Sequence, residues 1–229
     1  LNVGFLSRMQ RGLPFVRMKI AASLDGRTAL DDGRSQWITG AAARRDGHAW
    51  RRRAGAILTG IGTVRADDPR LDVRDVPIAK QPLRVVVDAR AELTPTARIV
   101  QPPGDLRVYT LDDQGDGARR LRDAGVQVVA APGLMGRVDL AHVLRDLAAQ
   151  GVNELHVEAG PRVNASLLAG DAVDELLVYL APMFIGPGRG MADLLPLPDL
   201  ASAPRFTFFD STLIGADLRL RAGRGTPCG

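Results

Sequence analysis

Apolar residues fall into short runs along the chain, and their spacing predicts strands. The first run alternates Val16, Met18 and Ile20 with Arg17 and Lys19, which is the two-residue period of a strand with its basic residues on one face. An Asp-Gly turn ends this strand. Later runs predict strands over residues 55–60, 83–89, 106–110, 126–130, 154–160 and 174–182, and residues 205–210 and 217–221 predict a terminal antiparallel pair.

Helices are predicted between these strands, over residues 41–53, 117–125, 139–151 and 161–170. Asp139 is a candidate N-cap of the third helix, and Gly125 and Gly151 stand where the second and third helices should end. Alternating strands and helices followed by extra strands predict an α/β fold. Its mixed sheet should be mostly parallel, flanked by helices, with antiparallel C-terminal strands.

Three segments lack a regular pattern and are predicted to be loose: residues 1–13, 112–117 and 186–198. None is long enough to divide the 229 residues convincingly. We therefore expect a lead-in over residues 1–13 and one domain over residues 14–229.

Composition narrows the class of protein. The net charge of +4 favours an anionic ligand, but the basic residues are scattered and no aromatic residues interleave with them as in a nucleic-acid platform. The single cysteine, Cys228, excludes an internal disulfide and favours the cytoplasm. No apolar run approaches the roughly 20 residues of a membrane span, and the first residues lack a signal-peptide pattern. We expect a cytoplasmic protein that binds neither nucleic acid nor membrane.

The sharpest local signal is the stretch LHVEAGPRVNASLL. A predicted strand ends at Glu158, Gly160 follows, and Pro161 occupies the favoured first position of a helix. Free N–H groups at such a helix start bind phosphate, and the carboxyl end of a strand is where α/β sheets place ligands. An ordinary β–α turn explains the pattern equally well, because such turns are common.

A second glycine-rich strand exit is GIGTVRADDPRL. It offers Gly60 and Gly62 but has Arg65 where a dinucleotide fingerprint needs a third glycine, so it fails as that motif. It still supplies flexible backbone and the Thr63 hydroxyl. Asp67 and the residues after it should end any helix, and one of the two aspartates there is expected simply to cap a turn.

Several other side chains could serve a site. Trp37, one of two tryptophans, lies in the loop stretch SQWITG, where it either plugs the core or forms one wall of a site. A lone strand lysine such as Lys19 usually faces solvent. Arg51 and Arg74 could clamp a phosphate. The three histidines, His48, His142 and His156, lack metal-ligand spacing, and no nucleophile motif of a serine hydrolase is present.

Five stretches resemble one family in order: KIAASLDGRTA, SQWITG, AGAILTGIGTVRADDPRLDVR, LHVEAGPRVNASLL and DELLVYLAPMFIGPG. They are similar to the reductase domain of the bacterial riboflavin-biosynthesis deaminase–reductase, and the resemblance spans roughly residues 5–220. It implies a dihydrofolate reductase-like fold, with residues 1–13 as the joint to a deaminase domain. The zinc-binding signature of that deaminase has no counterpart here, so we expect no metal and a deaminase domain upstream or on a separate chain.

The resemblance also implies residue roles. The family uses NADPH to reduce the ribosyl group of 5-amino-6-(5-phosphoribosylamino)uracil to a ribityl chain. Substrate positions match Ser35, Arg51, Leu71, Arg74 and Glu158, and NADPH positions match Ala21, Trp37, Thr63, Asp67, Gly160, Pro161, Arg162, Val163, Asn164, Ala165 and Ser166. Trp37 is thus expected to be a cofactor wall. Ala89 stands where the family often has serine.

The catalytic acid remains open at this level. Lys19, Asp67 and Glu158 are the titratable candidates, and a proton relay through water or substrate is an alternative. Three other functions compete: a reductase of the non-deaminated diaminopyrimidine, dihydrofolate reductase itself, and a non-catalytic binding domain for pyrimidine or, through its basic residues, for nucleic acid. The family resemblance further implies a homodimer.

Overall fold

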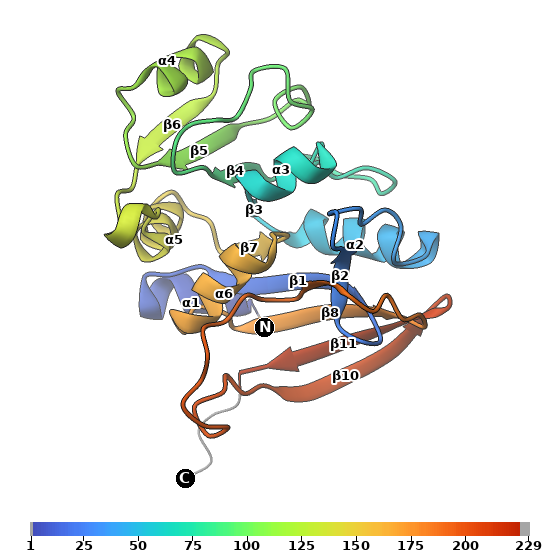
Figure 1. The fold of residues 1–229 in the computed structure, drawn as a ribbon. Helices are drawn as coiled ribbons and strands as arrows, with labels where there is room; N and C mark the ends of the chain where they lie inside the picture. The colour runs from blue at the N-terminus through green and yellow to red at the C-terminus, as the bar shows by residue number, and fades with distance from the viewer. Residues whose placement is uncertain (1, 225–229) are drawn as a thin grey trace. The chain divides into compact units, whose positions relative to one another are not determined.

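The computed structural model describes residues 2–224, which form two compact units. Among the described residues, unit 1 consists of residues 2–15 and His48–Val157, and unit 2 consists of Val16–Gly47 and residues 158–224. Figure 1 labels the helices and strands. Helix α2 (Ala41–Arg53) belongs to unit 2 as far as Gly47 and to unit 1 beyond it.

The sheet of unit 1 is entirely parallel. Its strands follow the spatial order β7 (Glu154–Val157), β3 (Ala56–Gly60), β4 (Leu83–Val87), β5 (Leu106–Thr110) and β6 (Gln127–Ala130). The unit also contains α1 (Val3–Arg11), α3 (Ile61–Asp67), α4 (Asp116–Asp123), the 3₁₀ turn η1 (Leu134–Gly136) and α5 (Leu140–Ala149). Asp139 caps α5 as predicted, because its Oδ1 accepts the N–H of His142 at 3.0 Å.

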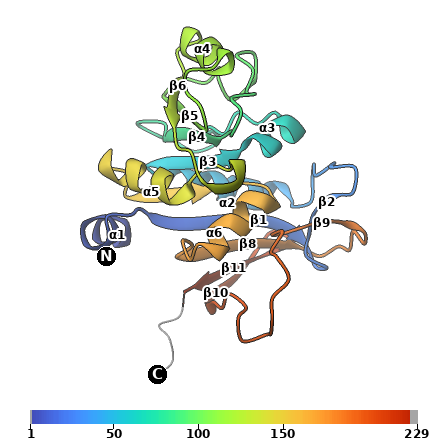
Figure 2. The same cartoon turned by 60° about the vertical axis from the view of Figure 1, so that its left-hand side comes forward.

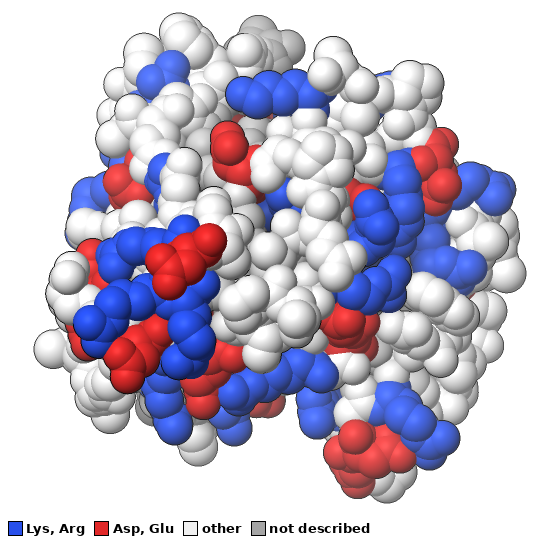
Figure 3. Space-filling model, turned by 90° about the horizontal axis from the view of Figure 1, so that it is seen from above, with Lys and Arg blue, Asp and Glu red and all other residues white. Residues whose placement is uncertain are grey.

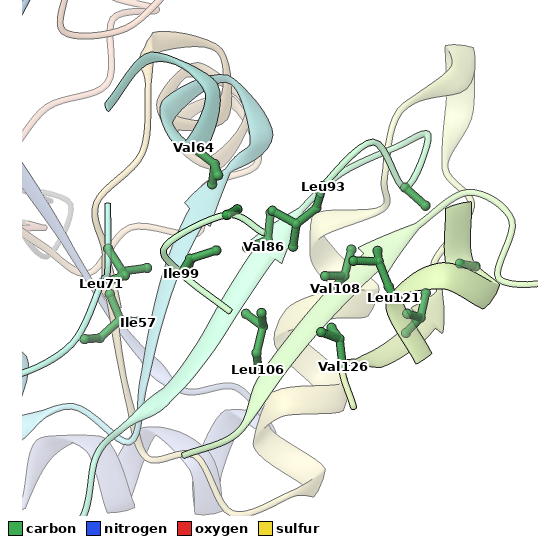
Figure 4. Close-up of a cluster of buried hydrophobic side chains, with 14 residues drawn as sticks. Ile57, Val64, Leu71, Val86, Leu93, Ile99, Leu106, Val108, Leu121 and Val126 are labelled. Atoms are coloured by element: carbon green, nitrogen blue, oxygen red, sulfur yellow. The ribbon is translucent and has the colours of Figure 1, made fainter. Parts of the chain in front are cut away.

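The core of unit 1 is aliphatic. Figure 4 shows its side chains converging from α3, the strands β3, β4 and β5, and the segment around α4. Ile57, Ile99, Val108 and Leu121 are inaccessible to solvent. Burying one such side chain contributes about 1.5–3 kcal/mol, which is why these β-branched and leucine runs predict the strands so well.

Unit 2 mixes parallel and antiparallel strands. Strands β1 (Phe15–Ser23) and β8 (Glu175–Ala181) are parallel, β11 (Asp217–Gly223) pairs antiparallel with β8, and β10 (Thr207–Ile214) pairs antiparallel with β11. Helix α6 (Pro161–Ala169) lies beside β1 and β8 in both Figure 1 and Figure 2. The predicted mixed, mostly parallel sheet with antiparallel C-terminal strands is therefore confirmed.

The polar side of β1 differs from the prediction. Arg17 was expected to share a polar face with Lys19, but it is only 1% exposed. Its Nη2 lies 3.1 Å from Glu175 Oε2, and Arg221 Nε donates to the other oxygen of that carboxylate at 2.8 Å. Glu175 on the neighbouring strand thus pairs with both arginines, and an alternating sequence pattern cannot reveal a partner 158 residues away.

Two predicted loose segments contain regular structure. Residues 1–13 hold α1, where the Asn2 side chain accepts from Phe5 N at 3.1 Å and Gly12 ends the helix at φ 67°. Residues 186–198 hold β9 (Gly188–Gly190), which pairs antiparallel with β2 (Arg27–Leu30). Both elements are short, and β2 and β9 pair in a two-stranded sheet of their own. The boundary between lead-in and domain at residue 13 stays a prediction.

Candidate active site

The predicted site residues divide between the two units. Unit 2 contains Lys19, Ala21, Ser35, Trp37, Glu158 and the segment 160–166, and unit 1 contains Arg51, Thr63, Asp67, Leu71 and Arg74. Within each unit the structure brings several of these residues together.

Lys19 and Glu158 form the centre of the group in unit 2. Lys19 Nζ lies 3.8 Å from Glu158 Oε2, and the two side chains are only 23% and 13% exposed. The ammonium also lies 6.0 Å from the centroid of the Tyr179 ring, at the outer limit of a cation–π contact. The general expectation of a solvent-facing strand lysine is therefore wrong for Lys19.

The register of β1 and β8 explains why these side chains meet. Ala21 pairs with Tyr179 and Lys19 pairs with Leu177, and partners in neighbouring parallel strands point to the same side of the sheet. Glu158 follows the end of β7 directly, where a strand ends and α6 soon begins. A compact cation and a carboxylate are thus held together in a half-buried place, an arrangement able to orient hydroxyl groups or hold a proton.

Tyr179 is itself held by a polar network in unit 2. Its hydroxyl donates to Asp46 Oδ2 at 2.6 Å, and Arg219 Nη1 contacts the same oxygen at 3.1 Å. Arg219 Nη2 reaches Asp210 at 3.1 Å. Burial raises the pKa of Tyr179 well above its usual value, and the neighbouring Asp46 carboxylate raises it further, so the phenol stays a hydrogen-bond donor.

Trp37 does not plug the core. Its side chain is 65% exposed, and the Arg44 guanidinium lies 4.4 Å from the ring centroid. Arg44 in turn donates to Thr39 O at 2.8 Å, which ties the stacked pair to the start of α2. An exposed indole beside a cation offers a flat apolar wall to a ligand.

The start of α6 carries the segment 160–166. Gly160 is the N-cap and makes no side-chain capping bond, and Pro161 occupies the first turn as predicted. Asn164, only 2% exposed, donates through Nδ2 to Met191 O at 2.9 Å. Its Oδ1 is buried without a hydrogen-bond partner among the described residues. A buried acceptor without a donor is costly, and a ligand donor or water would satisfy it.

Arginines gather around one carboxylate in unit 1. Asp72 accepts from Arg70 Nε at 3.0 Å and from Arg74 Nη1 at 2.6 Å, and its backbone carbonyl accepts from Arg51 Nη1 at 2.9 Å. Burial alone would raise the pKa of Asp72, but the hydrogen bonds from Arg70 and Arg74 outweigh it and lower the pKa below its usual value. Two guanidinium groups share this one carboxylate, which leaves an excess of positive charge that suits a phosphate.

Leu71 and His48 support this cluster rather than face a ligand. The Leu71 side chain is 2% exposed and packs in the core of unit 1, and its φ of 51° turns the backbone between Arg70 and Asp72. Any substrate contact of Leu71 would have to use its backbone. His48 Nδ1 accepts the N–H of Arg74 at 3.3 Å, which is the structural role expected for that histidine.

Thr63 and Asp67 both lie on α3. The helix ends at Asp67, and Asp68 follows in the left-handed region and accepts from Arg98 N at 2.8 Å, as expected for a capping aspartate. A surface depression of unit 1 lies against α3, but none of the predicted site residues line it. Its lining consists of Ile61, Val64, Arg65, Asp68, Glu92, Leu93, Thr94, Thr96 and Ala97. We assign it no role.

Among residues 2–224, no group of three His, Cys, Asp or Glu side chains is arranged to hold a metal ion. No helix in the same part of the chain is long and apolar enough to cross a membrane. Cys228 lies outside the described residues.

Sequence reasoning missed several residues of these clusters. Asp46 and Tyr179 were read only as parts of a helix and a strand, and Arg70 and Asp72 as parts of a loop. One available signal was the rarity of tyrosine, which occurs twice in the chain. Another was the alternation of charges in RLDVR, where Asp72 stands between Arg70 and Arg74.

Comparisons with known proteins cover nearly the whole chain. A model of the RibD C-terminal domain matches residues 14–220. The riboflavin biosynthesis protein RibD of Escherichia coli K12 is 40% identical in an alignment of 234 positions, which covers 96% of this chain and 62% of that protein. RibD of Haemophilus influenzae is 35% identical, and that alignment covers 96% of this chain and 61% of that protein. The chain thus spans about three fifths of the length of these curated relatives.

Solved structures agree with these matches. Acinetobacter baumannii RibD, form 1, is 36% identical with a TM-score of 0.86, covering 99% of this chain and 62% of that one. A Thermotoga maritima protein is 24% identical with a TM-score of 0.83, and the match covers 97% of this chain and 60% of that one. It is described as a diaminohydroxyphosphoribosylaminopyrimidine deaminase/5-amino-6-(5-phosphoribosylamino)uracil reductase. Enterococcus faecalis dihydrofolate reductase is 12% identical with a TM-score of 0.52, and the match covers 93% of this chain and 97% of that one. The last two show the fold alone, and the predicted dihydrofolate reductase-like fold is confirmed.

Proposed function

Because the chain belongs to the family of RibD C-terminal domains, we propose that it reduces the ribosyl group of 5-amino-6-(5-phosphoribosylamino)uracil to a ribityl chain, with NADPH as the reductant. The observation that carries the proposal is that the matched range, residues 14–220, contains both polar clusters. These are the Lys19–Glu158 pair in unit 2 and the arginines around Asp72 in unit 1.

Arg51 and Arg74 are assigned to the phosphate of the substrate. Both contact Asp72, so their guanidinium groups are already oriented before a ligand arrives. Arg70 adds a third positive charge that the sequence reading did not include. A charge-assisted contact of this kind contributes about 1.5–3 kcal/mol.

NADPH fits the chemistry of unit 2 in two respects. The exposed Trp37 ring offers a stacking surface, and the start of α6 combines an uncapped first turn with the unsatisfied Oδ1 of Asn164. Ala21, Arg162, Val163, Ala165 and Ser166 in unit 2, and Thr63 and Asp67 in unit 1, complete the proposed cofactor contacts. When bound, NADPH supplies the hydride.

Lys19 and Glu158 are assigned to the reacting end of the substrate. A ribosylamine whose ring opens offers an imine at C1′, and its reduction needs a proton on the nitrogen or on the departing ring oxygen. The Lys19 ammonium carries protons, and Glu158, 3.8 Å away, keeps that ammonium oriented and can accept hydrogen bonds from the pyrimidine. Ser35 is a further proposed substrate contact. Asp67, on α3 in unit 1, remains a candidate for holding a proton.

Steady-state assays of the nicotinamide absorbance test the proposal. We expect this chain alone to oxidise NADPH when the deaminated ribosylaminouracil phosphate is present, and neither without it nor with the diaminopyrimidine precursor. A folded sample that leaves NADPH unchanged with the deaminated substrate would contradict the function. Oxidation with the precursor instead would favour the alternative reductase, and salt-sensitive DNA binding without NADPH binding would favour a basic binding domain.

The surface charges give the nucleic-acid alternative little support. On the face drawn in Figure 3, acidic side chains lie among the basic ones, so no continuous basic stripe crosses that face. This proposal places the protein in the cytoplasm, with the matching deaminase domain upstream or on a separate chain.

A homodimer is also part of the proposal. Strand β10 lies at an edge of the unit 2 sheet and exposes apolar side chains, namely Phe208, Phe209 and Leu213, each more than half accessible. The adjacent β11 and β8 turn Leu218, Leu220, Val178 and Leu180 to one half-buried face. Phe209 lies against the Arg221 guanidinium, 4.7 Å from its ring centroid, and the remaining aliphatic side chains offer an apolar face that can pack against a second copy. Concentration-dependent mass measurement, with Leu213→Asp as the disrupting variant, tests it.

A further inference from the structure

Lysine is rare in this chain. Of 30 basic residues only two are lysine, at positions 19 and 80. An ion pair alone does not require one, since Arg17 pairs with Glu175 two residues earlier on the same strand. A lysine at position 19 therefore suggests that a compact ammonium with rotatable donors is used there, and that something must hold its flexible four-carbon stem.

The Tyr179 ring lies where it can hold that stem. The ring centroid is 6.0 Å from Lys19 Nζ, on the side of the sheet that β1 and β8 share. The Tyr179 side chain is buried and cannot follow a moving lysine. Together with Glu158 at 3.8 Å, the ring restricts the ammonium from two directions.

Asp46 fixes the ring in turn. It comes from α2, and its carboxylate accepts the Tyr179 hydroxyl at 2.6 Å. Arg219 from β11 contacts both oxygens of Asp46, at 3.3 and 3.1 Å, and so prevents the carboxylate from turning away. The ring is therefore anchored by α2 directly and by β11 through Asp46.

We propose that Tyr179, anchored by Asp46, is a positioning residue that holds the Lys19 ammonium toward Glu158. The effect on turnover rests on the proposed function, whereas the effect on Lys19 itself does not. Neither residue needs to touch substrate or cofactor. Loss of the anchor should lower kcat and leave the KM for NADPH nearly unchanged, because only the orientation of Lys19 changes.

The chain contains a matched control. Tyr109, its only other tyrosine, is equally buried on β5 of unit 1, and its hydroxyl donates to Asp146 at 2.5 Å. Arg107 contacts the same carboxylate at 3.2 Å. Substituting Tyr109 removes a similar tyrosine–aspartate contact at a position without a neighbouring lysine.

Isotope labelling of lysine in the full chain tests the proposal without substrate or cofactor. Only two side-chain signals should appear, and Lys80→Arg identifies the Lys19 signal by removing the other. We expect Tyr179→Leu to move the Lys19 ε-methylene resonance toward that of Lys80, and Tyr109→Leu to leave it in place. Tyr179→Phe, which keeps the ring, provides a milder variant should Tyr179→Leu fail to fold.

Kinetics complete the test. We expect Tyr179→Phe and Asp46→Asn to lower kcat about two- to tenfold, the equivalent of one hydrogen bond, with the KM for NADPH within a factor of about two. Tyr109→Phe should leave kcat unchanged. An unmoved Lys19 signal in Tyr179→Leu, or an equal loss of kcat in Tyr109→Phe, would overturn the proposal. If the wild-type chain shows no turnover, the proposed function fails, and the Lys19 signal still decides whether Tyr179 holds the ammonium.

Discussion

The two units contain the same polar contact in different surroundings. In unit 2, Tyr179 on β8 donates to Asp46, which Arg219 contacts; in unit 1, Tyr109 on β5 donates to Asp146, which Arg107 contacts. Both tyrosines are at most 1% exposed. Burial, followed by the neighbouring carboxylate, raises the pKa of each above its usual value.

The difference lies in what borders each ring. Tyr179 has Lys19 beside it, and Lys19 pairs with Glu158. Arg107, next to Tyr109, instead donates to Gln127 through Nε and Nη2, on the exposed edge strand β6. A buried tyrosine–aspartate contact is thus a common way to satisfy a phenol inside a sheet, and it gains a functional meaning only from its neighbours.

Substituting Lys19, the residue that distinguishes the two regions, should have the largest effect on kcat. If Lys19 holds the proton for the reaction, Lys19→Met lowers kcat about 100- to 10,000-fold, the usual contribution of a general acid. Lys80→Met, at the exposed lysine, serves as the control. Turnover is followed by NADPH absorbance. A kcat of Lys19→Met within a few-fold of wild type would show that the proton comes from elsewhere.

A smaller effect is expected from the arginines of unit 1, because they bind rather than react. Arg51→Ala and Arg74→Ala should each weaken substrate binding about ten- to a hundredfold, as expected for one lost charge-assisted contact. Arg52→Ala, an exposed neighbour of Arg51 on α2, is the matched control. The comparison is made with phosphorylated and dephosphorylated substrate. Equal losses for both substrates would remove the phosphate assignment.

The smallest effect concerns stability, in which the two tyrosines should behave alike. Each phenol keeps its proton in the folded state above pH 10, where the unfolded chain loses it, so stability falls as the pH rises from about 10 toward the raised pKa. The expected slope is about 1.4 kcal/mol per pH unit for each tyrosine. Tyr109→Phe and Tyr179→Phe should each make urea unfolding less pH-dependent between about pH 9 and 11. If neither variant changes how steeply the free energy of unfolding falls with pH, the two buried tyrosines do not cause this pH dependence.

Much of the fold could be predicted from local patterns. The strand over residues 106–110 and the helix over residues 41–53 have the predicted bounds, and Asp139 is the predicted cap. Such features depend on neighbours within a few residues. The helix Val3–Arg11 was missed because its apolar residues do not mark its buried side: Val3, Phe5, Leu6 and Met9 are exposed, whereas Gly4 and Ser7 are buried.

The candidate site was predictable only in part. Family resemblance identified Trp37, Glu158 and the arginines, and Lys19 was a candidate because it is titratable. The structure pairs Lys19 with Glu158 and joins Arg51 to Arg74 through Asp72. Their roles in binding and catalysis stay predictions. The resemblance did not indicate Asp46 or Tyr179, because their importance depends on a register between β1 and β8 that joins residues about 160 positions apart.

The sequence by itself determined most of the longer strands and helices of this protein, because hydrophobic periodicity, caps and glycines act over a few residues. The tertiary structure alone decided which charged groups are buried and which partners neutralise them. Arg17 is hidden because Glu175 lies on the next strand, and Lys19 is restricted because Glu158 and Tyr179 come from two other segments. Electrostatic interactions depend on distance in space, and strand pairing sets that distance.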